Sequence, residues 1–360
     1  MSVSVLPSNR EEEWRWSYLG AIPALEDAQP SGRLPDELPW VDCDPAGPRL
    51  LFVDGRLDAA RSLLGPVEIG RVDVEAADHP LASRAGKEGW RLRLGRDHAP
   101  GGLVQILNVS TGASDQLASA IDLDVDAQAS ILETFVGDGW TNRLTGIRLA
   151  KGARLMLHRR LIGTTGLATL TDRAIIGTGS SLVTATLAAG AADSRTDARV
   201  ELAGEQAYAE ASAALLARGR QRHDANFIVH HGLANGVSRQ IWRSVADDQS
   251  ACSVAARVEV ARHAQKTDAE QSIKGLLLAR SATINAKPEL EIFADDVKCA
   301  HGATVGQLDP ASLFYLESRG VTTDEARALL TRAFVADAID RVGEGKLRDL
   351  FYEDAQRWFA

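Results

Sequence analysis

From Gly102 onward, the sequence alternates short β-type runs with polar turn residues. Gly, Asn, Asp and Ser separate the runs, and no clear helical pattern of about 10–15 residues lies between them. Apolar residues of similar phase recur at intervals of 27, 31 and 26 residues, at Val200, Phe227, Val258 and Ile284. A nearly constant coil length with polar turns predicts a stacked β-solenoid, although a β-sandwich gives much the same local pattern. The runs are Leu103–Val109, Arg154–His158, Leu182–Leu187, Ala198–Leu202, Asn226–His230, Ala256–Val260, Leu276–Leu278 and Ala282–Ile284.

The composition favours a fold of short strands and tight turns. Only 5% of the residues are aromatic and 31 are glycine, so small side chains rather than aromatic rings line the expected core. At 360 residues the chain is long enough to bury a sizeable core. The formal net charge of −9 and the pI near 5.5 argue against nucleic acid or an anionic membrane as the partner.

The sequence predicts a cytoplasmic protein with reduced thiols. Met1–Trp16 contains the acidic run Glu11–Glu13 and no apolar stretch, which is unlike a signal or transit peptide. No window reaches the roughly 18 uncharged apolar residues of a membrane span. The three cysteines, Cys43, Cys252 and Cys299, are widely spaced, and no Cys-x-x-Cys pair occurs. We therefore expect free thiols and no membrane contact.

Three regions follow from these patterns. Residues 1–100 are expected to form an N-terminal mixed α/β or helical domain, with a short helix over Trp14–Leu19, a loop over Leu34–Trp40 and a helix around Arg56–Leu64. Residues 101–308 are expected to form the β-solenoid core. Residues 309–360 are expected to form a C-terminal helical domain.

The C-terminal helices have clear start and stop signals. Asp309-Pro310 is an N-cap followed by proline at the first helical position, and Gly320 ends that helix. Thr322 and Glu325 form a capping box for a second helix that runs to about residue 341. Its apolar stripe either caps the end of the solenoid, which the spacing alone favours, or receives a partner protein. The apolar positions of the second and third helices are Leu330, Phe334, Val335, Ala338, Ile339, Val342, Leu347, Leu350, Phe351 and Trp358.

Cys299 and His301 are the strongest candidate metal ligands. Residues two apart in a strand face the same side, so the thiol and the imidazole would lie together while Ala300 points away. Iron, zinc and copper accept both ligand types. Asp295 would share this face. It could orient the ligand side chains without binding the metal itself, or it could have a purely structural role. Two ligands are half of a metal site, and the alternative is a buried structural cysteine beside a hydrogen-bonded histidine.

The run Lys-Cys-x-His-Gly-Ala-Thr-Val-Gly-Gln at residues 298–307 resembles the SufD branch of the SufB/SufD family of iron–sulfur cluster assembly proteins. The SufB branch would be expected to carry a Glu-His-Glu-Ala-Thr-type sequence there. Glu11–Trp16 is similar to an element near the start of SufD-type proteins, and Gln265–Gln271 also resembles family positions, although its polar residues fit a structural ladder at a strand edge. The resemblance is dense from about residue 226 to 342. It implies a right-handed parallel β-helix as the core.

This resemblance implies a non-catalytic scaffold subunit of the cytoplasmic SUF complex. In the family, a SufB-like and a SufD-like β-helix protein pair side by side, and a nascent cluster is thought to form between them. His301 matches the position implicated on the SufD side, and Cys299 matches a neighbouring cysteine that is a ligand or structural. The expected cofactor is a transient iron–sulfur cluster or iron at the SufB interface, with none tightly bound to the isolated chain. Without a SufB-like partner, the chain could form a homodimer.

The same resemblance implies that the C-terminal helices dock the ATPase SufC. The residues expected at that contact are Leu313, Phe314, Leu316, Leu330 and Phe334. The chain itself lacks Gly-x-x-x-x-Gly-Lys-Ser/Thr, so it is not the ATPase of such a complex. It also lacks Gly-x-Ser-x-Gly, His-Glu-x-x-His and a dinucleotide-binding glycine run.

Two enzyme hypotheses are the alternatives. A free-standing β-helix enzyme that acts on polysaccharide needs converging carboxylates and aromatic platforms. Aromatic residues are sparse here, and the neighbouring acids Asp295 and Asp296 diverge if they lie in a strand. A stand-alone metal hydrolase would have to use Cys299, His301 and His263. We therefore expect the chain not to be an enzyme.

Overall fold

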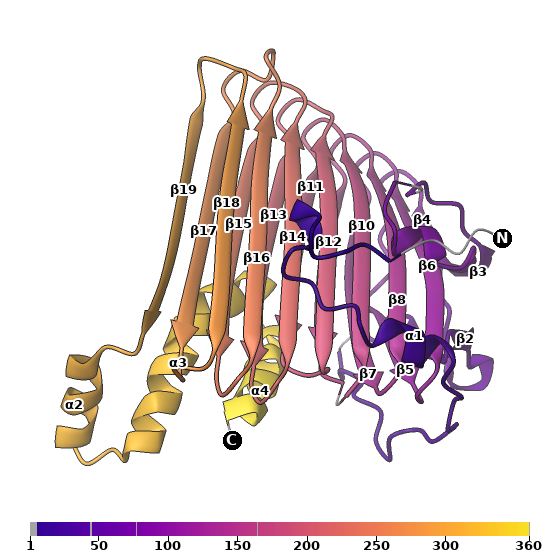
Figure 1. Cartoon of the computed structure of the whole chain (residues 1–360). Helices are drawn as coiled ribbons and strands as arrows, with labels where there is room; N and C mark the ends of the chain where they lie inside the picture. Colours follow the sequence, from indigo (N-terminus) through magenta and orange to yellow (C-terminus); the bar gives the residue numbers. More distant parts are fainter. Residues whose placement is uncertain (1–5, 44, 77, 164, 360) are drawn as a thin grey trace.

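The computed structural model describes residues 6–43, 45–76, 78–163 and 165–359. Its main body is a stack of coils whose strands form two long β-sheets (Figure 1). Sheet A has the strand order β19-β17-β15-β13-β11-β9-β7-β5-β1-β2, and sheet B has the order β18-β16-β14-β12-β10-β8-β6-β4-β3. All neighbours are parallel except β1 with β2 and β3 with β4. The predicted parallel solenoid is therefore confirmed, and the β-sandwich is excluded.

The strands of sheet A are β1 (Arg49–Val53), β2 (Arg56–Leu57), β5 (Val104–Ser110), β7 (Gln128–Gly137), β9 (Arg154–Leu161), β11 (Ser181–Ala188), β13 (Tyr208–Ala217), β15 (Val237–Ala246), β17 (Asp268–Leu277) and β19 (Lys298–Gln307). The strands of sheet B are β3 (Val67–Arg71), β4 (Glu88–Leu94), β6 (Ser114–Leu123), β8 (Trp140–Leu149), β10 (Leu167–Ile176), β12 (Asp193–Leu202), β14 (Arg222–His231), β16 (Ala251–Val260) and β18 (Thr283–Ile292).

Each coil contributes one strand to each sheet, so a coil holds two strands where the sequence pattern indicated about one. The expected repeat residues Val200, Phe227 and Val258 all lie on inward positions, but Phe227 pairs with Ala198 and Ala256 rather than with the two valines. The sequence pattern does not indicate strands such as β13, because alanine fills their inner positions and has a low β propensity.

The core lies between the two sheets. Along each strand, alternate side chains point inward, and one continuous apolar cluster runs from Leu50 in the first coil to Ile273 near the last. Parallel pairing reaches back to β1 and β4, which pair with β5 and β6. The coil stacking thus begins inside the range 1–100 that was expected to form a separate domain.

The N-terminal segment lies across the outer face of sheet B (Figure 1). The predicted helix over Trp14–Leu19 is wrong: the structure has a 3₁₀ turn, η1 (Glu12–Trp14), and a short helix, α1 (Ile22–Glu26). The Trp14 ring lies 3.8 Å from the Arg195 guanidinium, and the Ser17 hydroxyl donates to Asp224 at 2.5 Å. These contacts with the sheet, rather than helical hydrogen bonds, fix the segment.

The helix expected around Arg56–Leu64 is also wrong. That stretch forms the two-residue strand β2 and a 3₁₀ turn, η2 (Ala59–Arg61), which Asp58 caps by accepting from the Arg61 amide. A third 3₁₀ turn, η3 (Ala82–Arg84), follows.

The C-terminal helices are α2 (Pro310–Ser318), α3 (Thr323–Ile339) and α4 (Lys346–Phe359), with a 3₁₀ turn, η4 (Asp340–Val342), between the last two. The predicted Asp309 cap and the capping box of Thr322 with Glu325 are confirmed.

The helices α3 and α4 pack on the outer face of sheet A. Val335 and Ile339 of α3 share one buried cluster with Leu216 and Val245 of the sheet. The expected cap over the end of the solenoid is therefore wrong, because the apolar stripe covers the side of the coils and leaves the last coil open (Figure 1). No helix among the described residues is both long and apolar enough to cross a membrane.

Candidate functional site

The open end of the solenoid is formed by β18 and β19, the outermost strands of the two sheets. Each is ten residues long and pairs with a strand on one side only. Such an edge presents unpaired backbone N–H and C=O groups that can pair with another chain. Pro288 lies within β18. Proline is tolerated in an edge strand because the side without a paired strand requires no backbone N–H donor. Phe293, just beyond β18, is 57% exposed. This end is therefore a ready surface for association.

Cys299 and His301 lie on β19 and point toward the interior of this last coil. Cys299 pairs with Ala269 and His301 with Gln271, and both partners are buried inward residues of β17. The prediction that the two side chains share one face is confirmed. No coil of the described residues lies beyond them, so His301 is exposed at the open end, whereas Cys299 remains half-buried.

Cys299 packs against a buried apolar cluster made of Val258, Val260, Ala264, Ala269 and Ala294. Burial in this cluster raises the pKa of the Cys299 thiol above its ordinary value, so the thiol stays protonated at neutral pH. Binding a cation would have to displace that proton. The geometry thus offers one exposed imidazole and one shielded thiol on the same edge strand.

The predicted supporting role of Asp295 is not supported. Residues 293–297 form a turn between the sheets, so Asp295 is not part of the strand that carries Cys299 and His301. Its neighbour Asp296 is tied to Lys266 by an ion pair and by the Lys266 amide, which donates to the Asp296 carbonyl oxygen at 2.6 Å. Asp296 therefore holds the turn.

The other histidines do not assemble a metal site. His231 is fully buried inside the coil, with Nε2 2.8 Å from the Ser238 hydroxyl, and burial lowers its pKa to about 4. His230 lies on the opposite face of the strand, 3.4 Å from Glu259. His263 lies exposed in the turn between β16 and β17. Within the described residues there is no group of three His, Cys, Asp or Glu side chains that could hold a metal ion.

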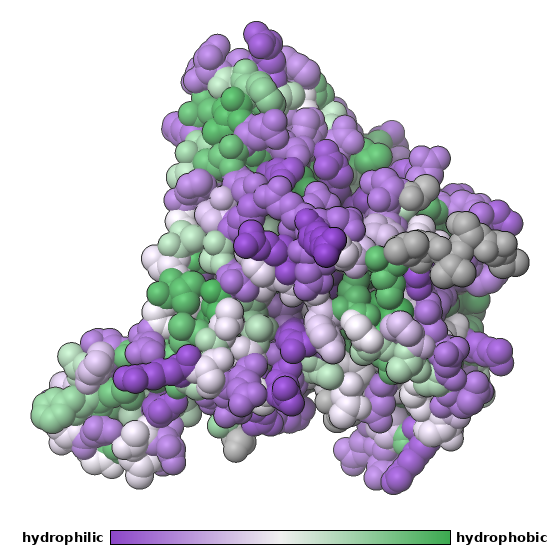
Figure 2. Space-filling model, viewed as in Figure 1, coloured by the Kyte–Doolittle hydropathy of each residue, from purple (hydrophilic) through white to green (hydrophobic). Residues whose placement is uncertain are grey.

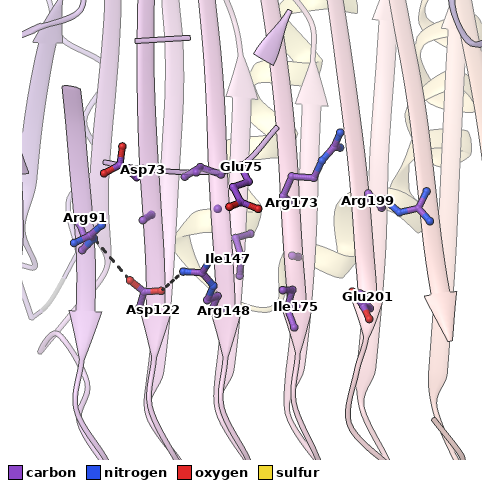
Figure 3. Close-up of a pocket in the computed structure, with 14 residues that line it drawn as sticks. Asp73, Glu75, Arg91, Asp122, Ile147, Arg148, Arg173, Ile175, Arg199 and Glu201 are labelled. Carbon is purple, nitrogen blue, oxygen red and sulfur yellow. Dashed lines mark ion pairs between the residues drawn. The ribbon is translucent and has the colours of Figure 1, made fainter. Parts of the chain in front are cut away.

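A groove of about 230 Å³ crosses the outer face of sheet B (Figure 3). Its arginines and carboxylates neutralise one another: Asp122 lies 3.7 Å from Arg91 and 3.9 Å from Arg148. The described side chains that line it include no aromatic residue. Because carbohydrate-binding grooves use aromatic platforms, this groove gives no support to the polysaccharide hypothesis. Its remaining charged residues are Asp73, Glu75, Arg173, Arg199 and Glu201.

A second exposed apolar surface lies on α2 and the start of α3. The helix α2 contains no buried residue, and Phe314 is 72% exposed. Leu313, Leu316 and Leu330 are half-buried. Figure 1 shows α2 projecting beyond the last strands, and Figure 2 shows apolar side chains on this projection. Phe334 differs from the others because it packs against the cluster between α3 and sheet A.

Comparison with known proteins gives consistent matches. Residues 107–334, more than half of the chain, match the family model described as "SUF system FeS cluster assembly, SufBD core domain". The chain is 25% identical over 95% of its length to the iron–sulfur cluster assembly protein SufD of Escherichia coli, of which the match covers 87%.

Two further relatives match over shorter regions. A SufBD family protein of Synechocystis is 36% identical over 44% of this chain and 36% of its own length. The SufD protein of Bacillus subtilis is 32% identical over 42% of this chain and 34% of its own length. The residues that match the family model, 107–334, include most of the stacked coils and the open end.

Proposed function

This chain belongs to the SufB/SufD family of iron–sulfur cluster assembly proteins, on the SufD branch, and from that premise we propose that it is a non-catalytic scaffold subunit of a cytoplasmic SUF complex. It pairs with a SufB-like paralogue through the open end of the solenoid, and a nascent cluster is built between the two chains. The observation that carries this proposal is the position of His301 and Cys299 on an edge strand that pairs on one side only.

The pairing surface is the edge formed by β18 and β19. Two ten-residue edges with exposed backbone groups, together with the exposed side chains of Ile292, Phe293 and Val305, suit another β-helix laid alongside. Pairing would cover apolar surface that the isolated chain leaves in water. A homodimer through the same edges is the arrangement to expect when the paralogue is absent.

His301 and Cys299 supply half of a ligand set. A cluster or iron ion, which is the cargo of assembly, needs further ligands, and no third His, Cys, Asp or Glu of the described residues joins them. We propose that the SufB-like partner supplies the remainder. His301 is exposed and is the primary ligand, while the protonated, half-buried Cys299 either joins the cluster or stays structural.

The apolar surface of α2 and the start of α3 is proposed to dock the ATPase SufC. On these two helices Phe314 is largely exposed, and Leu313, Leu316 and Leu330 are half-buried. Only two residues separate the end of β19 from the start of α2. A nucleotide-driven movement of the ATPase would therefore pull directly on the strand that carries His301.

The test of the ligand role is His301→Ala in the complex purified without oxygen. We expect the variant to fold and to pair, but to hold markedly less iron and acid-labile sulfide. His263→Ala, which removes an exposed histidine from a nearby turn, is the matched control and should keep the wild-type content. Unchanged cluster content in the His301 variant would refute the ligand role, and unfolding would mark His301 as a core residue.

The test of ATPase docking is Phe314→Asp. Because Phe314 makes no buried contact, the fold should be intact while co-purification of the ATPase is lost. Phe334→Asp is expected to abolish binding as well, but it also disturbs the packing of α3 on sheet A. Ile69→Asp, an exposed apolar residue near the opposite end of the solenoid, is the control and should bind normally. Full retention of the ATPase by the Phe314 variant would overturn this part of the proposal.

A further inference from the structure

Gln271 lies directly behind His301 and has no described hydrogen-bond partner. The two residues are paired in the parallel ladder of β17 and β19, and both face inward. Gln271 is only 1% exposed, yet neither its amide nitrogen nor its amide oxygen has a partner among the described residues. A buried amide without hydrogen bonds destabilises a fold, so such groups call for an explanation.

The surroundings of Gln271 leave few groups that could satisfy it. Its inward neighbours along β17, Ala269 and Ile273, are apolar. On the deeper side it is paired with Gln240, whose amide nitrogen donates to the Arg257 carbonyl oxygen at 3.3 Å and whose amide oxygen also has no partner among the described residues. On the open side the paired residue is His301, an exposed polar residue at the equivalent inward position. Adjacent strands lie about 4.8 Å apart, within reach of a glutamine side chain and an imidazole ring.

We propose that Gln271 is a positioning residue for His301, whose ring N–H donates to the Gln271 amide oxygen. This inference rests on the proposed function, because it concerns the same imidazole. It goes further by naming the group that sets the ring's orientation and tautomer.

The chemical consequence is selection of the nitrogen that meets the iron. A neutral imidazole carries its proton on one nitrogen and a lone pair on the other. An acceptor that holds the N–H on the buried side leaves the lone pair of the second nitrogen directed at the open end, where the partner chain and the metal arrive. Gln271 would thus turn a mobile surface histidine into an oriented ligand.

The chain offers a matched control in Gln240. It is also 1% exposed and occupies the same inward column, one coil deeper, so it is separated from His301 by Gln271. Gln240→Leu and Gln271→Leu make the same chemical change at equivalent depth. Only the second removes a group that can reach the His301 ring.

The experiment uses the full chain with ¹⁵N-labelled histidine and two-dimensional NMR of the rings at pH 8. His301→Ala identifies the His301 signal, and the exposed His263 provides a reference for an unconstrained ring. In the wild type and in Gln240→Leu we expect one dominant His301 tautomer. In Gln271→Leu the ratio of the two His301 tautomers should move to the ratio observed for His263. Thermal unfolding of all variants checks that each is folded.

The second readout is iron and sulfide content of each variant in the complex with the SufB-like partner. Loss of an outer-shell hydrogen bond to a metal-ligating histidine lowers metal affinity or activity by about 10- to 100-fold, so Gln271→Leu should fall well below Gln240→Leu. If the two leucine variants give the same tautomer ratio and the same cluster content, the positioning role is wrong. If instead His301→Ala retains clusters while Gln271→Leu still changes the tautomer, the proposed ligand function fails and the hydrogen bond stands.

Discussion

The ion pair between Arg160 and Asp354 should anchor the C-terminal helices to the solenoid. Arg160 Nε and Nη2 donate to the two Asp354 oxygens at 2.5 and 3.0 Å. The side chains are 1% and 2% exposed, so the pair joins β9 to α4 in a water-free contact. Replacing Asp354 by Ala leaves a buried guanidinium without its carboxylate.

The destabilisation expected for Asp354→Ala lies near the lower end of the range for removing one partner of a buried ion pair. Removing one partner of a buried pair destabilises by about 3–5 kcal/mol. Here the Pro39 carbonyl and the Thr134 hydroxyl still accept from Arg160 Nη1, at 3.3 and 3.4 Å, so part of its hydrogen bonding survives. We therefore expect about 3 kcal/mol, which is roughly a 150-fold increase in the population of undocked α4.

The assay is amide hydrogen exchange of α4, with Trp358 fluorescence in urea as a second probe. Because solenoids unfold in local units, α4 should lose protection while strands distant from it keep theirs. Asp296→Ala is the control, since its pair with Lys266 is about two-thirds exposed and should contribute at most about 1 kcal/mol. A change in α4 protection below about tenfold in Asp354→Ala would refute the reasoning. The double change Arg160→Met with Asp354→Leu should recover most of the loss, because it leaves no unpaired charge.

Two more predictions concern buried titratable groups. Burial lowers the pKa of His158, His223 and His231 to about 4, below the 6.5 expected when unfolded, so their stabilising contribution is complete above pH 6.5 and is lost as pH falls toward 4. The free energy of unfolding, measured with urea, should fall by about 2 kcal/mol per histidine between pH 7 and pH 5. Burial raises the pKa of Asp193 to about 6, and the protonation of this carboxylate in the folded protein offsets the loss only in part. A free energy of unfolding that does not change with pH would contradict the prediction. Cys252 is fully buried, and burial raises the pKa of its thiol. A thiol reagent should therefore modify Cys252 only after unfolding. Fast modification of all three cysteines in the native protein would contradict this prediction.

Local sequence signals predicted several features correctly. The caps at Asp309 and Thr322 mark the starts of α2 and α3 because an N-cap satisfies amides within its own turn. The shared face of Cys299 and His301 follows from the two-residue period of a strand. The coil spacing indicated a solenoid because stacking forces each coil to nearly the same length.

Other features depend on contacts between residues far apart in the chain. Asp295 falls in a turn because the chain crosses from sheet B to sheet A between β18 and β19, and the two-residue period continued backward from Cys299 gives no sign of that crossing.

The amino-acid sequence alone predicts the repeat, the helix ends and the side-by-side placement of Cys299 with His301, because each depends on periodicity or capping within a few residues. The tertiary structure decided which surfaces are covered. The stripe of α3 packs on the side of sheet A rather than over the last coil, and this leaves His301 exposed with Gln271 buried behind it. Burial is a property of the whole assembly of strands and helices, so no local pattern could have specified it.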